Sequence, residues 1–108
     1  MLHLNIQGLR DESGWQAAHI ALPRYDVSAM QERTLRHPVW IHFGAGNIFR
    51  AFLAAAQQTL LNAGLTDTGI LAAESFDVQI IDKVYDPYDD LSLLVRLRAD
   101  GSYEKEVV

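Results

Sequence analysis

Residues 39–50, which read VWIHFGAGNIFR, contain the strongest structural pattern in the chain. The first five of them are apolar and β-favouring, which is typical of a buried central strand. The glycine turn Gly44-Ala45-Gly46 follows at once. Residues 48–63 are then rich in Ala, Leu and Gln, which are good helix formers. The pattern therefore predicts a strand, a glycine turn and a helix in direct succession.

The predicted helix is followed by a second strand. Gly64 stands at the position after the helix end, where glycine is common because it adopts left-handed conformations at little cost. A short polar turn leads to the apolar run 70–73, which Glu74 closes. The order of these elements predicts one βαβ unit. The apolar positions of the helix that recur at helical spacing are Phe49, Phe52, Leu53, Ala56, Leu60 and Ala63.

The segments on either side give weaker patterns. Leu2, Leu4 and Ile6 alternate like a short strand, and Asp26 is a good N-cap for a helix through Thr34.

After Glu74 we expect a short helix and then a β-hairpin. Ser75 could cap the helix, and Pro87 would end it. Residues 91–97 and 103–108 read as two strands joined by Asp100-Gly101. The apolar positions that would share one face of the short helix are Phe76, Ile80, Ile81 and Val84.

Composition narrows the class of protein. The chain has 108 residues, of which 49% are hydrophobic and 21% charged, an ordinary globular balance. A net charge of −5 disfavours nucleic-acid binding, and apolar runs far shorter than about 20 residues disfavour a membrane span. There is no cysteine, and the four histidines form no close-spaced pair, so we expect no metal site. The lack of cysteine and of a secretory signal fits a cytoplasmic protein.

The glycine turn has the properties that a pyrophosphate site requires. Gly44 permits a tight turn, Gly46 lets the backbone approach a phosphate closely, and the helix beginning near Ile48 directs its positive end there. Phe49 replaces the usual third glycine. The motif is therefore weak alone, and the strand before it and the helix after it strengthen it.

An acidic residue at the end of the next strand completes this pattern. Glu74 could accept the ribose hydroxyls of NAD and would repel a 2′-phosphate. It lies 28 positions after Gly46, beyond the usual spacing of about 20, and Asp77 is the alternative.

Each of these residues also has a plainer interpretation. The glycines could be simple turn residues, and Glu74 could be a solvated carboxylate. Arg50 could contact a phosphate or substrate, or only pair with surface acids. Asn47 could donate to a phosphate, cap the helix, or do both.

The remaining polar and aromatic residues are interpreted as structural. We interpret His42 as a packed histidine rather than a base, because no partner is in view. The tryptophans and tyrosines are interpreted first as packing residues. A solvated turn, rather than a metal site, is expected of Asp86, Asp89 and Asp90.

Residues 40–52, WIHFGAGNIFRAF, resemble the N-terminal motif of the long-chain mannitol dehydrogenase family. That family includes mannitol and mannitol-1-phosphate dehydrogenases, fructuronate reductases (mannonate oxidoreductases) and tagaturonate reductases. Its pattern is G-x-G-x-[aromatic or aliphatic]-x-R, often without the third glycine, so Phe49 fits the family. Segments 23–26 and 73–77 and the predicted hairpin are similar to it as well.

The resemblance implies a partial Rossmann-like α/β domain that binds NAD. The implied cofactor-binding residues are Gly44, Ala45, Gly46, Asn47, Ile48, Phe49, Arg50 and Glu74. The family's catalytic lysine, with its asparagine and histidine companions, lies on a helical C-terminal domain, and neither Lys83 nor Lys105 matches it. We therefore expect no catalytic residue here. The implied reaction of the complete enzyme is hydride transfer between nicotinamide and a sugar alcohol or sugar acid.

The expected organisation is an N-terminal extension, residues 1–38, before the N-terminal part of a dinucleotide-binding domain, residues 39–108. We expect the chain to be the N-terminal piece of a longer protein, because one βαβ unit leaves sheet faces and edges open. Two other functions remain open. One is a methyltransferase-like domain that binds S-adenosylmethionine, and the other is a non-catalytic nucleotide-binding or assembly module.

Overall fold

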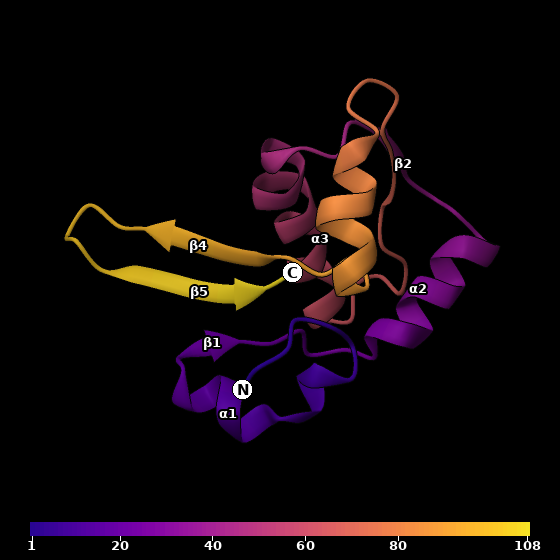
Figure 1. Ribbon diagram of the computed structural model, residues 1–108. Coiled ribbons are helices and arrows are strands. Elements are labelled where there is room, and N and C mark those ends of the chain that lie inside the picture. The colour runs from indigo at the N-terminus through magenta and orange to yellow at the C-terminus, as the bar shows by residue number, and fades with distance from the viewer.

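The computed structural model describes residues 1–108 and contains two small β-sheets with helices around them (Figure 1). The strands are β1 (Ile20–Ala21), β2 (Ile41–Phe43), β3 (Leu71–Ala73), β4 (Leu93–Leu97) and β5 (Tyr103–Val107). The α-helices are α1 (Glu12–Ala17), α2 (Val27–Arg36) and α3 (Ala55–Asn62). Two π-helical segments, η2 (Phe49–Ala54) and η3 (Ile81–Tyr85), and two 3₁₀ turns, η1 (Gly8–Arg10) and η4 (Asp86–Tyr88), complete the list.

The predicted βαβ unit is confirmed. Strands β2 and β3 pair in parallel, with Ile41 opposite Leu71. The helix between them consists of η2 followed directly by α3. Gly64 has a φ of 71° and donates its N–H to Leu61 O at 3.1 Å, so it closes the helix as predicted.

The helix buries a different face from the one its α-helical spacing predicts. Phe49 is buried as its spacing predicts, but Phe52 is 69% exposed, and Leu61, which lies outside the predicted set, is buried. The cause is η2, because a π-helix forms i→i+5 hydrogen bonds and rotates the chain less per residue than an α-helix. The prediction for Phe52, and for Leu60 on the same face, was therefore wrong.

Strand β2 is not a buried central strand. Ile41 is 52% exposed and Phe43 is 76% exposed, because β3 is the only strand that pairs with β2. Only the middle residue of the strand, His42, turns towards the helix side, where it packs on Phe49. The apolar run is thus an edge strand with one covered face.

The second sheet has the order β1-β5-β4. Strands β4 and β5 form the predicted antiparallel hairpin, and Gly101 in its turn has a φ of 86°. The hairpin projects away from the helices, and β1 runs parallel beside β5 (Figure 1). Strand β1 was not predicted. Residues 2–6, which were expected as a strand, instead form irregular structure, with a bend at residues 4–5 and a turn that begins at residue 6.

One apolar core joins the N-terminal segment to the hairpin. Its four buried members are Trp15, Val27, Leu91 and Val107. Asp26 caps α2 as predicted, since its carboxylate accepts the N–H of Ala29 at 3.0 Å.

The segment after Glu74 differs from its prediction. Ser75 does not cap a helix, and Phe76 is 98% exposed and precedes the helical residues. The helix starts later because the Glu74 carboxylate accepts the N–H groups of Phe76 and Asp77 and forms a turn there.

No helix combines the length and apolarity required to cross a membrane. The structure has no cluster of three or more His, Asp or Glu residues arranged to coordinate a metal ion.

Candidate functional site

The glycine turn follows the carboxyl end of β2 and lies beside the carboxyl end of β3. Gly44 has a φ of 114°, a conformation that residues with a Cβ rarely adopt. Its N–H donates to Ala73 O at 2.7 Å. The sharp turn after β2 is therefore fixed against the end of β3, where parallel α/β sheets bind ligands.

Glu74 contacts this turn directly. Its Oε2 accepts the N–H of Ala45 at 2.9 Å, and its Oε1 accepts the N–H of Phe76 at 3.0 Å. These hydrogen bonds lower the pKa of the Glu74 carboxyl, and the one from Ala45 has the largest effect. The group is therefore ionised at neutral pH. The structure thus brings together an acidic residue and a glycine turn that are 29 positions apart.

The carbonyl oxygen of Ala45 accepts two hydrogen bonds from side chains. Tyr85 Oη donates to it at 2.7 Å, and Arg50 Nη1 donates to it at 2.8 Å. The Arg50 guanidinium also donates to Asn47 Oδ1 and lies 5.5 Å from the centre of the Tyr85 ring. Arg50 therefore contacts the turn itself and forms no ion pair with surface acids.

The outer side of the turn remains open. The backbone N–H groups of Gly46, Asn47 and Ile48 donate to no acceptor in the chain. A Cβ placed on Gly46 would meet no heavy atom within 4 Å. Free N–H groups at the start of a helix carry its positive partial charge. This side of the turn is therefore suited to an anion.

Phe49 occupies the place of the usual third glycine. It is buried and stacks on His42, with ring centres 5.0 Å apart and planes 12° apart. The helix thus contacts β2 through two stacked rings instead of through close backbone packing. His42 has the packing role that its sequence context predicted.

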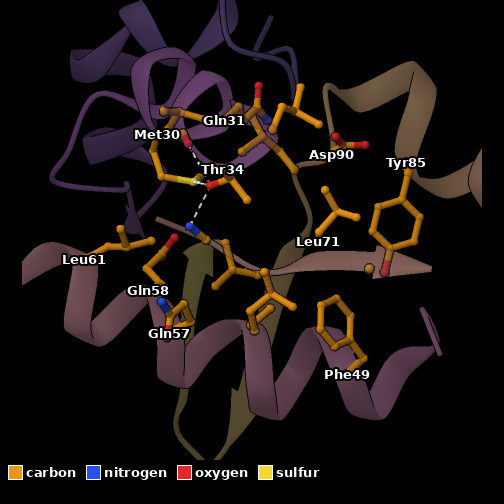
Figure 2. A pocket seen from close by; sticks show the side chains of 18 of the residues that line it. Met30, Gln31, Thr34, Phe49, Gln57, Gln58, Leu61, Leu71, Tyr85 and Asp90 are labelled. Atoms are coloured by element: carbon orange, nitrogen blue, oxygen red, sulfur yellow. Dashed lines mark hydrogen bonds between the residues drawn. The ribbon is translucent and has the colours of Figure 1, made fainter. Parts of the chain in front are cut away.

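A cavity of about 370 Å³ lies between α2, the η2–α3 helix and β3 (Figure 2). Phe49 and Tyr85 are at one end of it, and its lining is mostly apolar. The polar group of Thr34 is satisfied, because its Oγ1 donates to Met30 O and accepts from Gly69 N, each at 2.8 Å.

Asp90 lies at the edge of this cavity (Figure 2). Partial burial raises the pKa of its carboxyl, and repulsion from Asp86 and Asp89 raises it further. These three carboxylates lie in the turn that the sequence predicted.

Sequence reasoning missed Tyr85. It was interpreted only as a packing residue, yet its hydroxyl reaches the glycine turn from a helix 40 positions away. No local pattern marks it, because the contact depends on how η3 packs beside η2.

Comparison with known proteins gives one sequence relative and one similar structure. The chain is 43% identical over 107 residues to D-mannonate oxidoreductase of Thermotoga maritima. The aligned region is 99% of this chain and 20% of the relative, so the chain spans about a fifth of the relative's length. The crystal structure of a D-sorbitol dehydrogenase in substrate-free form matches with a TM-score of 0.67 and 24% identity. That match covers 84% of this chain and 18% of the other.

These similarities indicate the class of protein and its fold. The partial Rossmann-like α/β fold is confirmed, and the similar proteins are oxidoreductases. The resemblance to the long-chain mannitol dehydrogenase family is then confirmed through the mannonate oxidoreductase, which is similar over nearly the whole chain. No protein-family model matches the chain.

Proposed function

We propose that the glycine turn binds NAD(H), as the cofactor-binding part of an oxidoreductase that acts on a polyol or a hexuronate. One observation carries the proposal. Three unpaired N–H groups, at Gly46, Asn47 and Ile48, stand beside a turn whose inner side is bonded to the ionised Glu74. Residues 39–108 would then be the N-terminal part of a dinucleotide-binding domain, with residues 1–38 as an extension leading into it.

The unpaired N–H groups fit a pyrophosphate. They are adjacent in the chain, they begin a helix, and they donate to no acceptor in the chain. A phosphate at this position would accept from them and would lie at the positive end of the helix. The lack of a side chain on Gly46 would allow the phosphate to approach the backbone.

Glu74 fits an adenosine ribose. A carboxylate has about four acceptor positions, and three backbone N–H groups, those of Ala45, Phe76 and Asp77, donate to Glu74. A ribose hydroxyl could use the remaining position. A 2′-phosphate would instead meet a negative charge, which favours NAD over NADP.

The bound dinucleotide would supply hydride transfer at its nicotinamide ring. We expect no base for the accompanying proton among these residues. Lys83 Nζ donates to Gln79 at 3.1 Å, and Lys105 Nζ donates to Ala18 O at 2.7 Å, so neither lysine is bonded to the turn. The base would lie elsewhere in the complete enzyme. The named relative favours a mannonate or fructuronate type of substrate.

The test is a set of parallel titrations of the chain with NADH, NADPH and S-adenosylmethionine, followed by nicotinamide fluorescence and thermal shift. We expect saturable binding of NADH and weaker binding of NADPH. A shift with S-adenosylmethionine but not NADH would instead favour a methyltransferase-like domain. A folded chain that binds none of the three, and self-associates, would favour a non-catalytic assembly module.

A further inference from the structure

We propose that Tyr85, together with Arg50, is a positioning residue that aims the N–H of Gly46 at the cofactor's pyrophosphate. This inference rests on the proposed function, because it assigns the role of a further residue at the same site. The observation behind it is the pair of hydrogen bonds that Tyr85 and Arg50 donate to the carbonyl oxygen of Ala45.

The geometry of one peptide unit carries the argument. The C=O of Ala45 and the N–H of Gly46 belong to the same planar trans peptide, so they point in opposite directions. Tyr85 is buried, and it fixes the C=O towards the interior. The N–H of Gly46 must then point away from Tyr85, and it donates to no acceptor in the chain.

The same two bonds change how the helix begins. In a regular α-helix the carbonyl of Ala45 would accept the N–H of Phe49, four residues later. Tyr85 and Arg50 occupy that carbonyl instead, and the first backbone bond of the helix runs from Arg50 N to Gly46 O at 3.2 Å. The N–H of Phe49 therefore joins those of Gly46, Asn47 and Ile48, which have no acceptor because they lie in the first turn of the helix.

The preceding peptide, between Gly44 and Ala45, is fixed by Glu74, which accepts the N–H of Ala45. The C=O of Ala45 accepts from Tyr85 and Arg50. Both polar groups of this one residue are thus bonded to side chains from distant parts of the chain. Such a turn is ordered before ligand binding, which lowers the entropy cost of binding.

The hydroxyl of Tyr85 is a suitable donor. Burial raises the pKa of Tyr85, so the hydroxyl keeps its proton at neutral pH. The Arg50 guanidinium lies over the Tyr85 ring, 5.5 Å from its centre, within the range of a cation–π contact. Tyr85→Phe removes the hydroxyl and retains the ring and this contact.

The chain offers a matched control in Tyr25. Its hydroxyl is also partly buried and donates to a single acceptor, Gln58 Oε1, at 2.9 Å. Burial raises the pKa of Tyr25 to about 12, so this hydroxyl also keeps its proton. Tyr25→Phe therefore removes a comparable hydrogen bond that does not touch the glycine turn.

The experiment measures two quantities for the chain and both variants. The first is the ¹⁵N order parameter of the Gly46 amide without ligand, and the second is the dissociation constant for NADH. For Tyr85→Phe we expect a lower order parameter and about five- to tenfold weaker NADH binding, the scale of one lost hydrogen bond. Tyr25→Phe should change neither, at a similar melting temperature.

An unchanged order parameter in Tyr85→Phe would overturn the inference, and so would equal effects of both variants. Unchanged NADH binding despite a more mobile Gly46 amide would also overturn it. If the unsubstituted chain binds no NADH, the proposed function fails. The order parameter would still show whether Tyr85 fixes the turn, so the two failures are distinguishable.

Discussion

The hairpin region and the glycine-turn region of this chain are held together in different ways. Around the hairpin, Trp15, Leu91 and Val107 are buried in one apolar core. Around the glycine turn, Phe43 and Phe52 are largely exposed, and the contacts that define the turn are hydrogen bonds to the backbone. Apolar burial stabilises the first region, whereas directed polar contacts give the second a specific shape.

Because of this difference, substitutions in the two regions should affect different properties of the chain. Substitutions in the hairpin core should change the free energy of unfolding and act on ligand binding only through unfolding. Substitutions on the open side of the glycine turn should change ligand binding with little change in stability.

The largest effect is expected for Trp15→Ala. Trp15 is 4% exposed, and its indole N–H donates to Gly8 O at 2.9 Å. Its removal should lower the free energy of unfolding by about 3–5 kcal/mol, as is usual for a buried aromatic residue. Phe52→Ala, at an exposed position in the other region, should cost no more than about 0.5 kcal/mol. Urea unfolding followed by circular dichroism would measure both, and equal losses would contradict the comparison.

An intermediate effect is expected for two glycines with positive φ. Gly44 has a φ of 114° and Gly101, in the hairpin turn, has a φ of 86°. Alanine at either position should cost about 1–3 kcal/mol because of backbone strain. Only Gly44→Ala should also weaken NADH binding, since Gly101 is far from the turn along the chain. Thermal unfolding and NADH titration of both variants would test this, and weaker binding in Gly101→Ala would count against it.

A smaller, pH-dependent effect is expected for Glu74→Gln. The pKa of Glu74 is lower in the folded chain than its ordinary value of 4.5, so its carboxylate stabilises the fold fully above that pH. The contribution is lost as the pH falls through the lower, folded-state pKa. The stability difference between the chain and Glu74→Gln should therefore be constant at neutral pH and shrink below pH 4.5. Denaturant unfolding across this range would measure it, and a constant difference down to pH 3 would refute the role of the carboxylate.

The sequence predicts those parts of the fold that depend on local patterns. The strand–turn–helix–strand order follows from residues 39–74, and the hairpin follows from Asp100-Gly101. The cap at Asp26 and the helix end at Gly64 were also predicted, because each depends on neighbours within a few residues.

The parts that the sequence did not predict depend on packing. The buried face of the helix shifts because the first turns are π-helical, which the residue types there do not indicate. The exposure of Ile41 follows from the absence of a second neighbouring strand. The contact of Tyr85 with Ala45 joins residues 40 positions apart and required the fold itself.

The candidate site shows the same division. Gly44, Gly46 and Glu74 were predicted from motif chemistry, and the structure brings the carboxylate to the turn. Arg50 was predicted to contact a phosphate or substrate or to pair with surface acids; in the structure it bonds to the carbonyl of Ala45, and its role at a phosphate stays a prediction.

The central claim is that the open side of the glycine turn binds the pyrophosphate of NAD(H), and Gly46→Val tests it most directly. A side chain there would meet no protein atom near its Cβ, and the φ of Gly46 is not positive. For Gly46→Val we expect a change of no more than about 1 kcal/mol in the free energy of unfolding and at least about tenfold weaker NADH binding. NADH binding that is as tight in a folded Gly46→Val variant as in the unsubstituted chain would contradict it.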